Sequence, residues 1–323
     1  MNDDPIVEIK GLRKVFDISG GAISRMLMGK RELFAVDGVD LEIRQNRTVG
    51  IVGESGCGKS TLAKLLGKLI EPTEGSIRFR GEDILTLNKK RLKDIRREIQ
   101  LIFQDPFSSL NPRKKVIDLI GRPLELHFGL KGEEKRERVL SLMDQVHLRR
   151  EFIDRYPHEF SGGQRQRIVI ARALATNPSV LIADESVSAL DVSVQAQILR
   201  VLQKISKERG LTVMFISHDL NVVRYIADEV AVMYAGQIIE YAPVEEIFNN
   251  PKHPYTRALL ESNPDPDMVR PLKTIEGEPL VPINLKPGCR FAPRCPLRTD
   301  PCLEQRIPLE EKAPSHKVAC IHC

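Results

Sequence analysis

The part of this sequence best suited to chemistry is the glycine-rich run Gly53-Glu54-Ser55-Gly56-Cys57-Gly58-Lys59-Ser60-Thr61. An apolar run that ends at Val52 precedes it, and apolar residues with helical spacing follow it, so it is expected to join a strand to a helix. Glycine adopts backbone angles closed to other residues, which lets successive N–H groups face one anion at a helix start. A plain glycine-rich turn is the alternative, but the flanking strand and helix favour a nucleoside triphosphate site. Lys59 would then reach the β- and γ-phosphates, and Ser60 would ligate Mg²⁺.

Polar residues close three other apolar runs of the sequence. Gln104 follows residues 99–103, Asp184-Glu185 follows 179–183, and His218 follows 211–216 after one serine. Paired carboxylates at a strand end suit Mg²⁺ coordination by Asp184 and activation of water by Glu185. Gln104 could contact Mg²⁺ or water, and His218 could contact a γ-phosphate. A hydrogen-bonded glutamine at a strand end and a structural histidine are the alternatives for these two residues.

A second candidate anion site is Ser161-Gly162-Gly163-Gln164, which opens a helix expected to end at Asn177-Pro178. Ser161 is a suitable N-cap, and the two glycines would leave backbone N–H groups bare at the helix start. An ordinary capped helix is the alternative, although capping does not require paired glycines.

The remaining pattern predicts the elements that hold these residues. Apolar strands alternate with helical stretches, which predicts a mostly parallel sheet covered on both faces. From 106 to about 160 the pattern is helical, with breaks expected at Asn111-Pro112, Pro123 and Gly129, and this segment is expected to be an inserted helical subdomain. Residues 230–234 and 237–241 are expected to form a hairpin around Ala235-Gly236.

Composition limits the class of protein. The 323 residues are 41% hydrophobic, and 49 basic and 44 acidic residues leave a net charge of +5, too small to indicate a nucleic-acid partner. No apolar run approaches the length of a membrane span, and the N-terminus lacks the features of a signal peptide. The chain is therefore expected to be cytosolic. Because 13 of the 21 prolines lie from Pro251 onward, a domain boundary is expected between 1–248 and 249–323.

The C-terminal region, residues 249–323, also contains a cluster of cysteines. In a reducing cytosol the thiols Cys289, Cys295, Cys302 and Cys320 indicate metal more than disulfides. Four thiolates suit an iron–sulfur cluster or Zn²⁺, and unliganded or disulfide-paired thiols are the third alternative. Cys323 is expected to be a spare thiol that could replace Cys320. His316 and His322 are expected to be surface histidines rather than ligands.

The order of these motifs resembles the nucleotide-binding subunit of an ATP-binding cassette (ABC) transporter over roughly residues 6–245. More narrowly, the sequence is similar to the oligopeptide/dipeptide importers, and its tail resembles that of their second ATPase subunit. The stretches that carry this likeness are Ala35 to Val39, Ile102 to Pro106, Ser109 to Arg113, Arg155 to Phe160, Asn250 to Thr256 and the tail from Glu276 to Cys320.

The resemblance implies an α/β P-loop NTPase fold, with a RecA-like, mostly parallel sheet, an antiparallel β subdomain and the inserted helical subdomain. It implies that two such subunits pair head to tail, so that each ATP lies between one phosphate loop and the partner's signature, residues 161–164. Glu185 would be the general base, and His218 would hold the γ-phosphate. Gln104 would sense Mg²⁺ and the membrane subunit. Phe16 matches an adenine-stacking position, and Asp191 belongs to the nucleotide-contacting set.

The resemblance further implies ATP and Mg²⁺ as ligands, a [4Fe–4S] cluster on the four cysteines, and a location at the cytoplasmic face of the cell membrane. The implied partners are a second, homologous ATPase subunit, two transmembrane permease subunits and, indirectly, an extracytoplasmic solute-binding protein, with no nucleic acid. Related importers carry nickel or glutathione, so these solutes are alternatives to peptides. A soluble ABC ATPase and a non-hydrolysing regulatory subunit are the rival functions. One departure is Ser186, where the family usually has proline.

Overall fold

The computed structural model describes residues 4–20, 29–105, 109–188, 190–263, 277–285 and 287–323. These residues divide into two compact units, which are described separately. Unit 1 consists mainly of Thr86–Ile216, and unit 2 of Pro5–Ile43, Thr48–Leu85 and Ser217–Cys323. The predicted boundary between residues 248 and 249 stays a prediction.

Unit 1 combines three parallel strands with a group of helices. Its strands lie in the order β8-β7-β6, with bounds Thr212–Ile216, Val180–Asp184 and Ile99–Ile102. β6 pairs with β7, and β7 pairs with β8, in parallel. The helices of this unit are α3 (Lys89–Glu98), α5 (Val116–Phe128), α6 (Gly132–Gln145), η1 (Arg150–Asp154), η2 (Pro157–Glu159), α7 (Gly162–Leu174) and α8 (Val192–Arg209).

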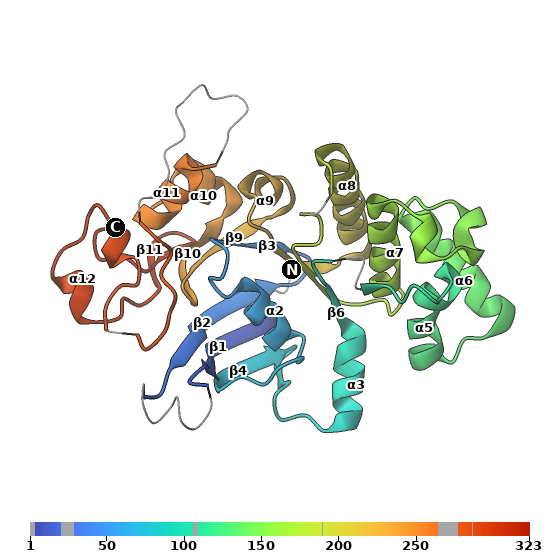
Figure 1. Ribbon diagram of the computed structural model, residues 1–323, viewed down its shortest axis with the longest axis horizontal. Helices are drawn as coiled ribbons and strands as arrows, with labels where there is room; N and C mark the ends of the chain where they lie inside the picture. Colours follow the sequence, from blue (N-terminus) through green and yellow to red (C-terminus); the bar gives the residue numbers. More distant parts are fainter. Residues whose placement is uncertain (1–3, 21–28, 106–108, 189, 264–276, 286) are drawn as a thin grey trace. The chain divides into compact units, whose positions relative to one another are not determined.

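The helices α5, α6 and α7 pack on one another, and Figure 1 draws them in shades of green. α5, α6, η1 and η2 all lie between β6 and β7 in the chain, as predicted for an inserted helical segment. The break expected at Pro123 is wrong, because α5 runs through this residue. Proline removes one helical hydrogen bond, but burial of Val116, Leu119, Ile120 and Leu124 on the same helix stabilises it.

Unit 2 contains an antiparallel sheet with the strand order β2-β1-β4-β5. The strands are β1 (Pro5–Asp17), β2 (Glu32–Arg44), β4 (Glu74–Phe79) and β5 (Glu82–Asp83). Val7 lies opposite Phe79, and Ile9 lies opposite Ile77. These four side chains are buried, so the alternation of apolar residues along β1 fixes the register of the pair.

The rest of unit 2 is built on β3 (Thr48–Val52), which pairs in parallel with β9 (Glu229–Tyr234). β9 and β10 (Gln237–Pro243) form the predicted antiparallel hairpin. The other elements are α2 (Lys59–Leu66), α9 (Leu220–Ile226), α10 (Val244–Asn249), α11 (Pro254–Glu261), η3 (Ala292–Arg294), α12 (Pro301–Glu304), β11 (Glu310–Ala313) and β12 (His316–Val318).

The C-terminal region joins this sheet instead of forming a separate layer. β12 pairs antiparallel with β10, and β11 pairs with β12, as the red and orange segments of Figure 1 show. His316 is 0% exposed, and its Nε2 lies 2.7 Å from Glu240 Oε1. The expectation that His316 lies on the surface is therefore wrong, because β12 carries it against the buried carboxylate of β10. Within the part of the chain that the structure describes, none of the helices has both the length and the hydrophobicity needed to cross a membrane.

Candidate functional site

The glycine-rich loop joins β3 to α2, as predicted. Its backbone requires glycine, because φ is 149° at Gly53, 78° at Gly56 and 110° at Gly58. A Cβ atom at Gly53 would lie 2.1 Å from the carbonyl oxygen of Met233, and one at Gly58 would lie 2.1 Å from that of Ala35. The loop therefore has a shape that other residues could not adopt without displacing backbone.

Lys59 is the first residue of α2 and lies only 5% exposed beneath the loop. Its Nζ donates hydrogen bonds to the carbonyl oxygens of Gly53, at 2.7 Å, and Glu54, at 3.0 Å. Ser55 and Gly56 at the loop's centre are exposed. A buried ammonium, a helix start and an exposed glycine-rich bend form the combination that binds phosphate groups. The loop thus fits a nucleoside triphosphate, with Ser60 adjacent to Lys59.

The side chain of Cys57 packs inside this loop. It is buried, and burial raises the pKa of the thiol. A neutral, buried thiol is a poor nucleophile, so a contact of Cys57 with a nucleotide would involve its backbone.

Unit 1 brings together two of the predicted residues. Gln104 follows β6, Glu185 follows the neighbouring strand β7, and Gln104 Nε2 donates to Glu185 Oε2 at 2.7 Å. Asp184, the last residue of β7, is 5% exposed. Glu185 adopts φ of 45°, in the left-handed region that costs energy for a residue with a side chain. Ser186 is buried, and its Oγ has no hydrogen-bond partner among the described residues.

The segment 161–164 forms the start of α7, also in unit 1. Ser161 Oγ accepts a hydrogen bond from the Gln164 backbone N–H at 3.4 Å, and Gln164 Oε1 accepts one from the Ser161 N–H at 3.1 Å. This capping box confirms Ser161 as the N-cap. A Cβ atom at Gly163 would lie 2.3 Å from Val194 Cγ1, so glycine permits the close approach of α7 and α8. Ser161 itself is exposed.

Three other predicted residues are accessible. Asp191 precedes α8 and is exposed, without a side-chain capping hydrogen bond. His218 follows β8 and is exposed. Phe16 lies half-buried near the end of β1, with Lys14 Nζ 5.0 Å from its ring centroid. Two residues of the predicted motifs lie outside the described residues: Pro106, at the end of the stretch Ile102 to Pro106, and Ala189, two positions before Asp191.

The four candidate cysteine ligands lie in one part of the C-terminal region. Burial raises the pKa of both Cys289 and Cys295. Neighbouring thiols add to the rise, Cys295 and Cys302 at Cys289, and Cys320 and Cys302 at Cys295. Cys302 Sγ is 3.5 Å from Nε2 of His322, which is exposed as predicted. Among the described His, Cys, Asp and Glu side chains, however, no three are arranged to hold a metal ion. The donor chemistry suits a metal, but the sulfur atoms are not converged. Cys323 is exposed, and its Sγ donates to the carbonyl oxygen of Lys252.

Two residues that contact the phosphate loop were not predicted from the sequence. Arg294 binds the Glu54 carboxylate, and the Tyr255 hydroxyl accepts a hydrogen bond from the Glu54 N–H. Both residues lie about 200 positions or more from Glu54 along the chain. No local spacing in the sequence marks such a contact.

Together, the strand, glycine loop and helix with a buried lysine define a P-loop nucleotide-binding protein. Comparison with known families extends this assignment. Residues 36–188 match the family model described as "ABC transporter", and residues 239–302 match "Oligopeptide/dipeptide transporter, C-terminal region". The chain belongs to the ATP-binding subunits of the ABC transporter family, with the C-terminal region of the oligopeptide/dipeptide transporters.

Curated relatives match over nearly the whole chain. The dipeptide transport ATP-binding protein DppF of Haemophilus influenzae is 47% identical, over 98% of this chain and 97% of its own length. The oligopeptide transport ATP-binding protein AppF of Bacillus subtilis is also 47% identical, over 99% and 98%. A solved dimeric ATP-binding cassette with bound ADP and phosphate superposes with a TM-score of 0.65 at 31% identity, over 74% of this chain and 98% of that one. The chain has the ABC cassette fold.

Proposed function

We propose that this protein hydrolyses ATP to drive the uptake of oligopeptides or dipeptides across a membrane. The observation that carries the hydrolytic part is the 2.7 Å hydrogen bond between Gln104 Nε2 and Glu185 Oε2, at the ends of adjacent parallel strands. It orients a carboxylate that can accept a proton from water. The names of the near full-length relatives support the peptide cargo.

In this proposal the nucleotide's phosphates bind the loop 53–61, where Lys59 contacts the β- and γ-phosphates. Ser60 and Asp184 would hold Mg²⁺, directly or through water, and Gln104 would contact it. Bound Mg²⁺ neutralises the negative charge that develops on the phosphate oxygens. Glu185 would accept the proton of the attacking water, and His218 would hold the γ-phosphate.

The second half of each site would come from another subunit. Ser161 and Gly163 would contact the γ-phosphate held by the partner, together with Gly162, Gln164 and Asp191, and Phe16 would stack on adenine. Ser161, exposed at the start of α7, supports this arrangement, because the N–H groups of a helix start, here those of Gly162 and Gly163, bind anions. The partner is proposed to be a different, homologous ATPase subunit.

Hydrolysis is tested with Glu185→Gln in the full chain, assembled with its membrane partners. Removing a general base lowers the rate by about 10²- to 10⁴-fold, while ATP binding should remain. Glu151→Gln, at an exposed carboxylate on η1, is the matched control and should hydrolyse ATP at the wild-type rate. Unchanged phosphate release by Glu185→Gln would refute the assignment of the base and favour a different catalytic residue.

The cargo is tested by transport into proteoliposomes that contain the complete complex. Labelled dipeptides and tripeptides should accumulate only when ATP is supplied on the side of this subunit. Accumulation of nickel or glutathione without peptide uptake would assign the same ATPase role to another solute. ATP turnover without a permease partner in the cell would instead support a soluble ABC ATPase.

We propose that the permease docks on a groove in unit 1, at the cytoplasmic face of the membrane. The groove has a volume of about 660 Å³ and is lined by residues of α5 and its surroundings, including Leu119, Arg122 and Leu126. Leu126 is 51% exposed in this groove, where an apolar partner side chain could cover it. Leu126→Glu should therefore abolish co-purification with the permease. Leu69→Glu, at a leucine 49% exposed outside the groove, should not; equal retention of both variants would contradict this surface.

We propose that Cys289, Cys295, Cys302 and Cys320 ligate a [4Fe–4S] cluster. Their electrostatic proximity supports this, and the soft thiolate set suits iron–sulfur or zinc. Since the sulfur atoms are not converged, loading would have to draw them together. Anaerobically purified protein should be brown and contain about four irons per chain, and Cys302→Ser should lose them. A colourless, iron-free sample would refute the cluster, and stoichiometric zinc would assign the site to that metal.

A further inference from the structure

Glu54, the residue after the first glycine of the phosphate loop, has all its polar groups engaged. Its N–H donates to the Tyr255 hydroxyl at 2.9 Å, and its carbonyl oxygen accepts from the Cys57 N–H at 3.3 Å and from Lys59 Nζ at 3.0 Å. Its carboxylate accepts from Arg294 Nη1 at 2.8 Å and Nη2 at 3.1 Å. Contacts within the loop and contacts from the C-terminal region therefore both fix the first bend of the loop at Glu54.

The outside contacts come from buried, well-packed residues of the C-terminal region. The Arg294 side chain is 5% exposed, and Tyr255 is fully buried. The ring centroids of Tyr234, Tyr255 and Phe291 lie 4.6 to 5.5 Å apart, and Arg294 follows Phe291 closely in the chain. Packed aromatic rings and a bidentate ion pair both fix orientation. The hydrogen bonds from Arg294 to Glu54 raise the pKa of Arg294, so its charge is permanent.

The charge of this pair matters because the loop fits an anion. An unpaired carboxylate at Glu54 would repel a triphosphate, and its repulsion would be strong at a partly buried site with a low effective dielectric constant. Arg294 neutralises this charge and orients the carboxylate towards its own guanidinium group. The bidentate geometry also holds the backbone of Glu54 in place, which supports the carbonyl oxygen that Lys59 contacts.

We propose that Arg294 is a positioning residue for the phosphate loop: it neutralises and orients Glu54 and, with Tyr255, makes nucleotide affinity depend on the C-terminal region. This inference rests on the proposed function only in that the loop binds a nucleoside triphosphate. It gives the C-terminal region a role at the nucleotide site that does not require a metal on its cysteines.

The test compares wild type, Arg294→Met, and Arg294→Met combined with Glu54→Gln, all as full-length chains, with the dissociation constants of ATP and ADP measured by equilibrium dialysis. Arg294→Met should weaken ATP binding about tenfold, because the Glu54 charge becomes unpaired. Glu54→Gln with Arg294→Met should recover affinity to within about threefold of wild type, since no unpaired carboxylate remains. The loss in Arg294→Met should also shrink at high salt, which screens this repulsion.

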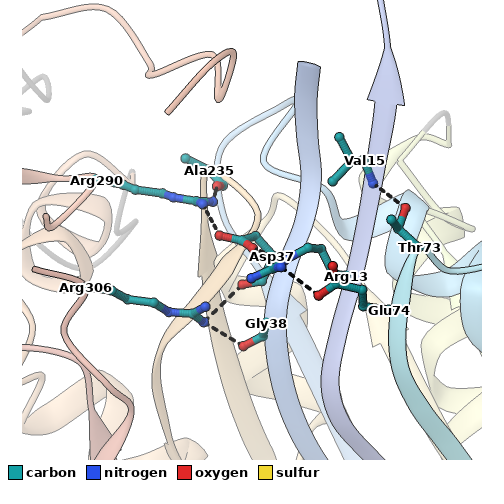
Figure 2. Close-up of polar contacts among 9 residues, drawn as sticks. All are labelled: Arg13, Val15, Asp37, Gly38, Thr73, Glu74, Ala235, Arg290 and Arg306. Carbon is teal, nitrogen blue, oxygen red and sulfur yellow. Dashed lines mark hydrogen bonds and ion pairs between the residues drawn. The ribbon is translucent and has the colours of Figure 1, made fainter. Parts of the chain in front are cut away.

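Arg306→Met is the matched control. Arg306 also comes from the C-terminal region, but its Nη2 donates to the carbonyl oxygens of Asp37 and Gly38 on β2, at 3.1 and 2.7 Å (Figure 2). This variant should bind ATP like wild type. Tyr255→Phe removes one oxygen atom beside Glu54 and should weaken ATP binding about threefold. If Arg294→Met does not fold, Tyr255→Phe still tests whether the C-terminal region affects nucleotide affinity.

Three results would overturn the proposal. The first is wild-type ATP affinity in folded Arg294→Met or, if that variant does not fold, in Tyr255→Phe. The second is an equal loss of ATP affinity in Arg306→Met, and the third is a double variant that binds ATP as weakly as Arg294→Met. Failure of the proposed function is separate. It would appear as a wild-type chain that does not bind ATP, or as wild-type hydrolysis by Glu185→Gln, and neither depends on Arg294.

Discussion

Between pH 6.5 and 3, the pH dependence of stability should be dominated by His253, the N-cap of α11. Its Nδ1 accepts a hydrogen bond from the Tyr255 N–H at 3.0 Å, and its own N–H donates to Glu240 Oε2 at 3.0 Å. The side chain is buried at 1% exposure, and burial lowers its pKa from 6.5 to about 3. The folded chain thus holds a neutral imidazole, whereas the unfolded chain binds a proton below pH 6.5.

Because the pKa is lower in the folded chain, its contribution to stability is present above pH 6.5 and is lost as the pH falls from 6.5 towards 3. At pH 5 the unfolded chain is almost fully protonated at this residue and the folded chain is not. The free energy of unfolding should therefore be about 2 kcal/mol lower at pH 5 than at pH 8 from this residue alone. The limiting slope is about 1.4 kcal/mol per pH unit.

His253→Asn isolates the contribution, because the asparagine Oδ1 can accept the same capping hydrogen bond but does not titrate. Urea unfolding of the full chain at pH 8, 7, 6 and 5 gives the free energy of both proteins. The wild type should lose about 2 kcal/mol more than the variant between pH 8 and 5. Subtraction removes the effect of other groups near His253, including Glu240 and His316.

His158→Asn, at an exposed histidine, is the control and should follow the wild type at every pH. Parallel curves for wild type and His253→Asn would refute the reasoning. They would mean that His253 keeps an ordinary pKa in the folded chain, and hence that the C-terminal region is open to water at this position.

Three further predictions concern unit 2. Gly58→Ala should abolish measurable ATP binding by equilibrium dialysis, because the new Cβ would meet the Ala35 carbonyl oxygen at 2.1 Å; retained affinity would show that the loop can relax. Phe291→Ala should lower the free energy of urea unfolding by about 3–5 kcal/mol, since this ring is 2% exposed; a loss below about 1 kcal/mol would contradict the packing. Arg290 pairs with the buried Asp37, as Figure 2 shows, and Arg13 Nε also lies 2.7 Å from Asp37 Oδ1. Arg290→Met should therefore lower the free energy of urea unfolding by about 2 kcal/mol, less than a fully unpaired charge because Arg13 remains; an unchanged value would show that the pair contributes nothing.

Most of the site could be predicted from residues that are contiguous in the sequence. The residue types of the run 53–61 require a bend of glycines before a helix, and the structure confirms the strand, the bend and the helix in that order. Likewise, Ser161 and Gln164 cap their helix because the two residues are three positions apart. Gln104 and Glu185 were each predicted at a strand end. Their contact needs only that β6 and β7 be neighbours, which parallel strands of this kind commonly are.

The inserted helices illustrate how local preference can mislead. Pro123 predicts a break because proline cannot donate a helical hydrogen bond. α5 continues through it, since apolar residues before and after it are buried on one face. Tertiary packing outweighs a local cost of a few kcal/mol when several side chains are buried together.

By itself, then, the sequence determined the phosphate loop, the polar strand ends, the capped helix start and the family. Each of these depends on residues that are close together in the chain, or on the order of the strands that those residues form. Only the tertiary structure decided that Arg294 and Tyr255 fix Glu54, that His316 lies buried against Glu240, and that β12 extends the sheet beside β10. The physical reason is that these contacts join segments far apart in the chain. Their energies come from shared burial and paired charge, which residue spacing does not encode.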